Sequence, residues 1–116
     1  MFNVIDNSGD HIRCFKNGGV GIVSAFSPAY AAHDLQVAEL LASSKYDEAK
    51  ALTDKESEIL GPVIATVAAS GGGYRLARGM MEIVGHPAGP PRLPTEPLNV
   101  EELKLLKDAM RKLGWV

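Results

Sequence analysis

The chain has 116 residues, 46% of them hydrophobic, and its 12 lysines and arginines against 14 acidic residues give a net charge of −2. These values are typical of a globular domain with a modest core, and they exclude extensive disorder. The sequence has no basic stripe, which argues against nucleic-acid binding. It has no long apolar run, which argues against a membrane span. Its start is not a basic segment followed by an apolar stretch, which argues against a secretory signal.

Two β-prone segments occupy the first part of the chain. Residues 2–6 form a short run that ends in a cluster of turn-forming residues. Residues 20–25 form a nearly unbroken apolar run, which is typical of a strand buried on both faces, as in a parallel sheet. Residues 11–16 lie between them and have room for one or two helical turns before Gly18 and Gly19. We therefore expect two strands that run in the same direction.

From Asp34 onward the apolar residues recur with the period of a helix. We expect Asp34 to cap a first helix, which Ser43 and Ser44 then interrupt. A second helix follows, and Pro62 is expected to kink or break it because proline removes a backbone donor. The glycines of residues 71–73 are expected to end it.

The last part of the chain predicts two further helices and a connector. Residues 74–84 have a helical apolar pattern, whereas residues 85–97 contain five prolines and two glycines and are expected to be extended. Asn99, with Glu102 three residues later, predicts a capping box at the start of the final helix. Gly114 is expected to end that helix.

This order of elements is unusual for a self-contained domain. Two buried parallel strands need neighbouring strands on both sides and helices on both faces. After the second strand the chain supplies only helices. The sequence therefore predicts the end of a larger α/β fold.

Several short motifs follow one another in a recognisable order. Residues 8–10 and 18–24 resemble a passage that covers the seventh and eighth strands of a (β/α)8 barrel. Residues 46–49 resemble the start of a long helix after the barrel. Residues 89–94 and 113–115 resemble the C-terminal ending of the same family's sequence. The family that shares these motifs is the dihydrodipicolinate synthase / N-acetylneuraminate lyase family, and the resemblance covers essentially the whole chain.

The resemblance implies an α/β fold, the C-terminal fragment of a (β/α)8 TIM barrel. The last two parallel strands and their connections fall in residues 1–33, and the closing helix and a mostly helical extension fall in residues 34–116. It also implies class I aldolase chemistry, in which a strand lysine forms a Schiff base with pyruvate or a related 2-oxo acid and a tyrosine relays protons. Both residues belong to strands that precede this segment.

The seven lysines of this chain fall in predicted helices or in the connection between the strands, and none falls within a predicted strand. They are Lys16, Lys45, Lys50, Lys55, Lys104, Lys107 and Lys112. We therefore expect no catalytic residue and no cofactor in the chain, and no activity when it is alone.

Five residues are candidates for substrate binding through the resemblance. Ser8, Gly9 and Asp10 would be lip residues that contact the distal portion of the substrate; a turn with a side-chain hydrogen bond is the alternative. The backbone carbonyl of Val23 would lie beside the pyruvate, although a buried strand valine is the ordinary interpretation. Ser24 either reaches the barrel interior or serves close packing.

His11 stands where the family usually carries a second acid. It is a candidate general base or metal ligand, but no second ligand lies at metal spacing, so an exposed histidine at a helix start is expected and no metal site. Arg75 and Arg78 are expected to form surface ion pairs. Cys14 is expected to be a buried thiol.

A second hypothesis is a small helical protein-interaction module without enzymatic activity. Both hypotheses predict a homo-oligomer, because subunits of the resembled family use their C-terminal helices for such contacts. The expected partners are thus the 2-oxo acid of the longer enzyme and other copies of the chain, with no nucleic acid and no membrane. The single cysteine favours a reducing compartment, the cytoplasm.

Overall fold

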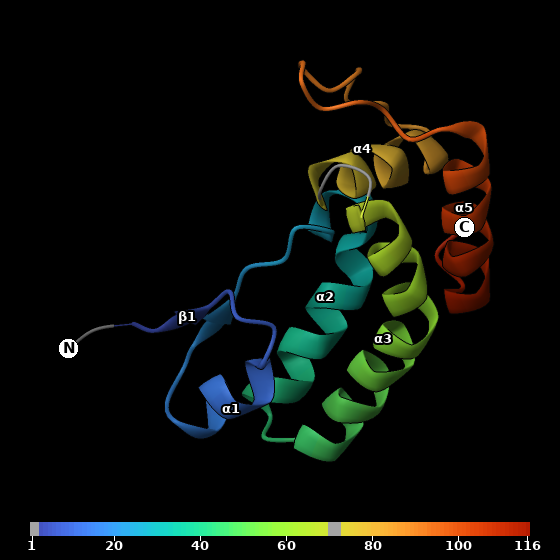
Figure 1. The fold of residues 1–116 in the computed structure, drawn as a ribbon. Coiled ribbons are helices and arrows are strands. Elements are labelled where there is room, and N and C mark those ends of the chain that lie inside the picture. The colour runs from blue at the N-terminus through green and yellow to red at the C-terminus, as the bar shows by residue number, and fades with distance from the viewer. Residues whose placement is uncertain (1–2, 70–72) are drawn as a thin grey trace. The chain divides into compact units, whose positions relative to one another are not determined.

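The computed structural model describes residues 3–69 and 73–116, which form two short strands and five helices (Figure 1). The chain divides into two compact units, residues 1–54 and 55–116, and the boundary lies within helix α3. The division at residue 33 that the barrel resemblance implies concerns a longer protein and stays a prediction.

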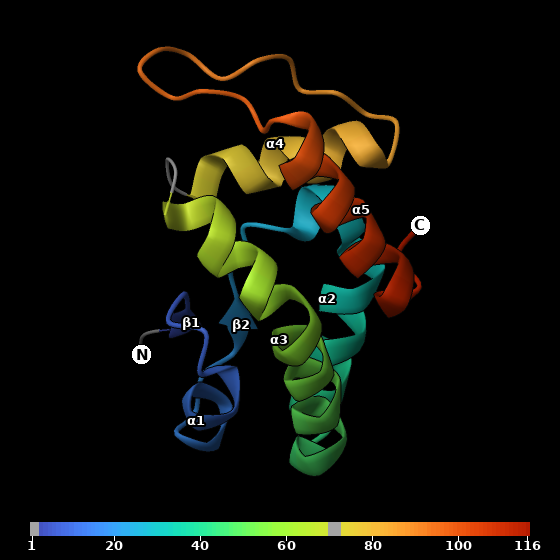
Figure 2. The same cartoon turned by 45° about the vertical axis from the view of Figure 1, so that its right-hand side comes forward.

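The first unit contains a parallel pair of strands, as the sequence predicts. Strand β1 (Ile5–Asp6) pairs with β2 (Gly21–Ile22), with Ile5 opposite Gly21, and the two lie side by side in Figure 2. Backbone hydrogen bonds extend the pairing at both ends, from Val20 N–H to the Val4 carbonyl (2.9 Å) and from Val23 N–H to the Asp6 carbonyl (2.8 Å). Both strands are shorter than expected, and Phe2, the predicted start of the first, lies outside the described residues.

Helices α1 (His11–Lys16) and α2 (Ser27–Ala42) follow the two strands. The core of the first unit consists of Val37 and Leu41 from α2 and Ala49 from the first turns of α3 (Tyr46–Ala69). The partly buried residues that pack against it come from all its elements except β1, and they are Ile12, Phe15, Ile22, Leu40, Tyr46 and Leu52.

The expectation that Asp34 caps a helix is wrong. Helix α2 begins at Ser27, with Pro28 in the first turn, where a backbone N–H is not needed. The backbone departs from helical angles at Tyr30 (φ −148°, ψ 69°), and the Ser27 hydroxyl donates a hydrogen bond to the Asp34 carboxylate beyond this kink. The predicted interruption at Ser43 and Ser44 is confirmed, since Ser43 ends α2 and Ser44 adopts a left-handed φ of 58°.

The second unit is helical. Helix α3 continues through Pro62, so the predicted break does not occur there. Gly71 and Gly72 lie outside the described residues, and α4 (Gly73–Ile83) follows. The connector after α4 has no regular structure, as expected, and leads to α5 (Val100–Leu113).

The start and end of α5 agree with the sequence signals. The Asn99 side chain accepts from Glu102 N–H (2.9 Å), the Glu102 carboxylate accepts from Asn99 N–H (2.8 Å), and Gly114 ends the helix in the left-handed conformation (φ 76°). Helices α4 and α5 pack together over a buried apolar core. Its members are Leu60, Val67, Leu76, Met80, Leu98, Leu106, Ala109, Met110 and Trp115.

Candidate functional site

A hydrogen-bonded network lies at the carboxyl end of β1. Asp6, the last residue of the strand, is only 9% exposed. One carboxylate oxygen, Oδ1, accepts from the backbone N–H of Ser8 (3.0 Å) and from its hydroxyl (2.6 Å). The other, Oδ2, lies 2.5 Å from Nδ1 of His11, the first residue of α1. The network thus holds the loop after β1 in place and orients the imidazole of His11 through its Nδ1 atom.

The electrostatics of Asp6 follow from these contacts. The hydrogen bond from the Ser8 hydroxyl, the one from Ser8 N–H and the nearby His11 together lower the pKa of Asp6 from 3.8 to about 2, against the opposing effect of burial. The carboxylate is therefore charged over the whole physiological range of pH.

This lowered pKa predicts a pH-dependent contribution to stability. Because the pKa of Asp6 is lower in the folded chain than its ordinary value of 3.8, the charged form stabilises the fold above that pH, and the contribution is lost as pH falls toward about 2. Asp6→Asn should therefore lower the urea midpoint of the first unit at pH 7, and the difference from the unsubstituted chain should shrink across this window. Asp54→Asn, which removes an exposed carboxylate paired with Lys50, should change the midpoint little. An Asp6→Asn difference that is constant from pH 7 to pH 2 would contradict this assignment.

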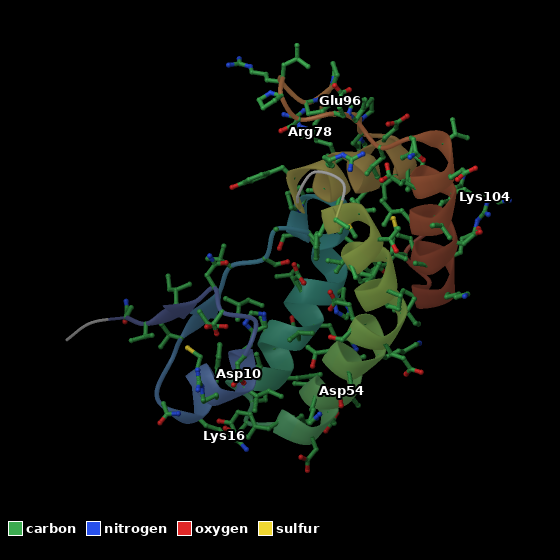
Figure 3. The ribbon with its side chains drawn as sticks, in the orientation of Figure 1. Asp10, Lys16, Asp54, Arg78, Glu96 and Lys104 are labelled. Atoms are coloured by element: carbon green, nitrogen blue, oxygen red, sulfur yellow. The ribbon has the colours of Figure 1, made fainter. Side chains whose placement is uncertain are left out.

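The predicted lip residues form the loop between β1 and α1. Ser8 belongs to the Asp6 network, and its hydroxyl also accepts from Asp10 N–H (3.2 Å). Gly9 has a φ of 86°, a conformation that suits glycine. The Asp10 carboxylate caps α1 by accepting from Arg13 N–H (3.2 Å), and Figure 3 labels Asp10 at the start of this helix. The turn with side-chain hydrogen bonds is thus present, and contact with a substrate stays a prediction.

Val23 and Ser24, the other two predicted substrate-binding residues, follow β2 and differ in their surroundings. Val23 N–H donates to the Asp6 carbonyl, so the backbone of Val23 lies beside the Asp6 network, and its side chain is 53% exposed rather than buried. The Ser24 hydroxyl accepts from Phe26 N–H (3.2 Å) within a turn. The structure therefore brings Val23 and Ser8 to the same end of the sheet, at the carboxyl ends of β1 and β2.

The expectation that His11 is exposed is wrong, because its side chain is 18% exposed and bound to Asp6. Asp6 was predicted only as the last residue of a strand, and its role in the network was missed. A signal was present, since an aspartate followed two residues later by serine favours a turn closed by the aspartate side chain.

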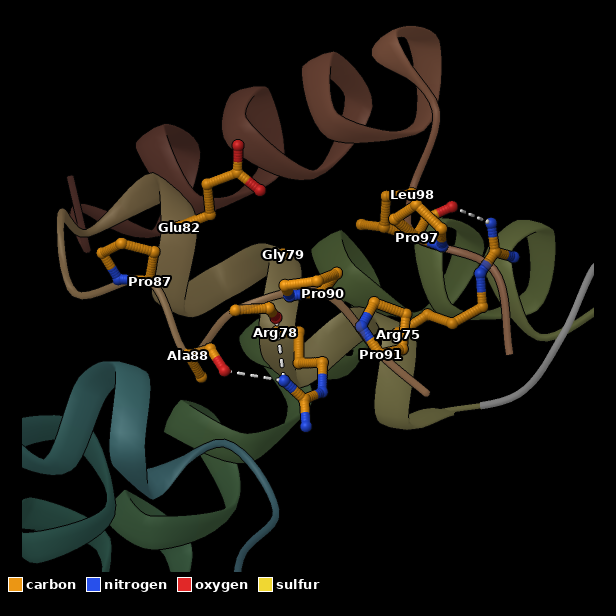
Figure 4. Close-up of a pocket in the computed structure, with 11 residues that line it drawn as sticks. Arg75, Arg78, Gly79, Glu82, Pro87, Ala88, Pro90, Pro91, Pro97 and Leu98 are labelled. Carbon is orange, nitrogen blue, oxygen red and sulfur yellow. Dashed lines mark hydrogen bonds between the residues drawn. The ribbon is translucent and has the colours of Figure 1, made fainter. Parts of the chain in front are cut away.

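The second unit contains a cavity of about 310 Å³ between α4 and the connector (Figure 4). Arg75, Arg78 and Glu82 of α4 line it, together with prolines of the connector and Leu98. One Arg78 nitrogen donates to the carbonyls of Ala88 and Gly89, at 2.8 Å each. The arginine thus holds the connector against α4.

The expectation of surface ion pairs is wrong for Arg75. This residue is 4% exposed, and its guanidinium donates to the Glu102 carboxylate (2.8 Å) and to the carbonyls of Glu96 (2.7 Å) and Pro97 (2.9 Å). Arg78 bonds to carbonyl oxygens rather than to a carboxylate of the described chain. Cys14 is partly rather than fully buried.

Two classes of site have no counterpart in residues 3–69 and 73–116. No group of three or more histidine, cysteine, aspartate or glutamate side chains lies close enough to hold a metal ion. None of the helices in these ranges combines the length and hydrophobicity that a bilayer crossing requires.

The fold of the chain resembles part of a larger protein. No protein-family model and no curated protein matches the sequence. Among solved structures, the chain is similar to the crystal structure of a "putative dihydrodipicolinate synthetase" from Pseudomonas aeruginosa, with a TM-score of 0.75 and 21% identity. The match covers 90% of this chain and 34% of that one. At this identity the likeness concerns the fold alone, and the chain spans about a third of the larger protein.

Proposed function

We propose that the chain is the C-terminal portion of a Schiff-base-forming, pyruvate-type aldolase or lyase similar to dihydrodipicolinate synthase. The observation that carries the proposal is the fold, which over 90% of the chain resembles about a third of a larger protein described as a "putative dihydrodipicolinate synthetase". The parallel pairing of β1 with β2 supports it, because consecutive strands of a barrel run in the same direction.

Exposed apolar residues in β1 and next to both strands also favour a larger sheet. Val4, Ile5, Val20 and Val23 are each between 53% and 59% exposed. Fully burying such a side chain contributes about 1.5 to 3 kcal/mol, which the two-stranded pair forgoes in large part. Further strands on either side of β1 and β2 would pair the free edges, and the interior and outer helices of a barrel would cover these side chains.

In this proposal the carboxyl end of the two strands, where Ser8 and Val23 lie, is the mouth of the active site, because barrels of this kind have their catalytic residues at that end. Ser8, Gly9 and Asp10 contact the distal portion of the substrate, and the Val23 carbonyl lies beside the 2-oxo acid. The lysine that forms the imine comes from a strand outside this chain. The helices of residues 55–116 contribute to a homo-oligomer.

The alternative, a helical interaction module, has one observation in its favour. Residues 55–116 form a compact unit with their own buried core, which includes Leu76, Leu106 and Met110. A core of its own favours a unit that folds without a barrel.

Both proposals predict self-association, and the surface that carries it separates them: the uncovered strands in the first proposal, and the helices in the alternative. We expect light scattering to detect concentration-dependent association, and circular dichroism to show helix that melts over a broad range, because the strand edges and their apolar residues have no cover. Ile5→Thr with Val23→Thr should reduce the association, whereas Leu93→Thr, at an 83% exposed position in the connector, should not. A clean monomer that melts in one sharp transition would support a self-standing domain and contradict the proposal.

A further inference from the structure

We propose that His11 is a proton-transferring residue, whose Nε2 exchanges a proton with a substrate at the carboxyl ends of β1 and β2. The inference rests on the proposed function for its place in a reaction, and it adds a second proton carrier to the tyrosine that the family resemblance implies. It concerns residues of this chain alone, so it is testable without the imine lysine.

The hydrogen bonds of Asp6 set the role of each imidazole nitrogen. Oδ1 already accepts twice from Ser8, and these bonds, with the nearby His11, lower the pKa of Asp6 to about 2. At neutral pH the carboxylate is therefore ionised and can only accept from His11. Nδ1 of His11, at 2.5 Å from Oδ2, therefore carries the hydrogen. In the neutral imidazole this leaves Nε2 with a free lone pair, the arrangement that a general base requires.

The carboxylate holds the imidazole by the same contact whether or not Nε2 carries a proton. When Nε2 takes a proton, the imidazolium lies against a carboxylate that is 9% exposed, and the ion pair offsets the new charge. The side chain of His11 is 18% exposed, which limits competition from water and still leaves an approach for a ligand. The loop also holds its own shape, because the Asp10 carboxylate is engaged by Arg13 N–H and by the Arg13 guanidinium (3.3 Å).

The step that this geometry supports in a Schiff-base aldolase is balanced without an added oxidant or reductant. Nε2 removes the proton of the hydroxyl that becomes the aldehyde. The C–C bond then breaks, and its electron pair passes into the iminium of the 2-oxo acid to form an enamine. The imidazolium afterwards returns a proton to the enamine carbon, which regenerates the iminium for hydrolysis.

The experiment uses the 116-residue chain and 5-nitrobenzisoxazole, a probe that opens to a nitrile and a phenolate when a base removes its C–H proton. We expect His11→Ala and Asp6→Asn each to lower the rate of opening about 100-fold, at the lower end of the usual range of general-base effects. His86→Ala, which removes an exposed imidazole elsewhere, should leave the rate unchanged. Equal rates for the unsubstituted chain and either His11→Ala or Asp6→Asn would overturn the proposal.

A loss of rate through misfolding is separated from a loss of the base by a second measurement. In ¹⁵N-histidine NMR of the unsubstituted chain, the neutral form of His11 should carry its proton on Nδ1, and Asp6→Asn should abolish that preference. A neutral His11 protonated on Nε2 would overturn the proposal even if every variant lost rate. Neither measurement involves an imine, so their failure is distinct from a failure of the proposed function.

Discussion

We expect the replacement of Arg75 by methionine to lower the free energy of unfolding of the helical unit by about 3 to 5 kcal/mol, the usual effect of removing one partner of a buried ion pair. The Arg75 guanidinium and the Glu102 carboxylate are 4% and 9% exposed and lie 2.8 Å apart. Without the arginine, Glu102 keeps a buried charge, and the carbonyls of Glu96 and Pro97 lose their donors. Urea unfolding followed by the fluorescence of Trp115, which is buried in this unit, measures the loss.

Two further variants identify the cause. Arg78→Met removes the next arginine along α4, which is less buried and bonds to carbonyls, so we expect a loss below about 1 kcal/mol. Combining Arg75→Met with Glu102→Leu removes both charges and should restore much of the stability. If Arg75→Met alone remains within about 1 kcal/mol of the unsubstituted chain, the pair does not support the unit as described.

The features that the sequence predicts well are those that a few neighbouring residues determine. The capping box of Asn99 and Glu102 and the stop at Gly114 depend on contacts within one helical turn, and both are present. The parallel strand pair was predicted because the second strand is apolar throughout, a pattern that alternating, half-exposed strands lack. The start of α2 was predicted at Asp34 and lies at Ser27, because Pro28 suits the first turn of a helix.

Features that depend on distant partners were missed. Arginine is mostly exposed in proteins, so Arg75 was predicted to lie on the surface. Its carboxylate partner lies 27 residues away in the sequence, and no local pattern indicates this contact. The candidate site shows the same limit at shorter range. Ser8 and Asp10 were recognised from their turn-forming type, whereas the contact between Asp6 and His11 depends on the path of the loop between them.

We expect the 116-residue chain to form no imine with pyruvate. An imine-forming lysine must present a neutral amine in a site that excludes water, usually on a barrel strand. None of the seven lysines lies on β1 or β2. Lys16 ends α1 and lies over the ring of Tyr46, Lys50 pairs with Asp54, and three others are on the exposed surface of α5. These are environments in which the ammonium is solvated or paired.

Borohydride trapping with pyruvate, read by intact mass and peptide mapping, tests this account most directly. The chain alone should gain no stoichiometric adduct, and any slow modification should be spread over its surface lysines. A longer protein that contains this chain and the preceding strands should gain one adduct, on a lysine outside these 116 residues. A stoichiometric adduct on any one of the seven lysines of the chain, or no adduct on the longer protein, would contradict the account.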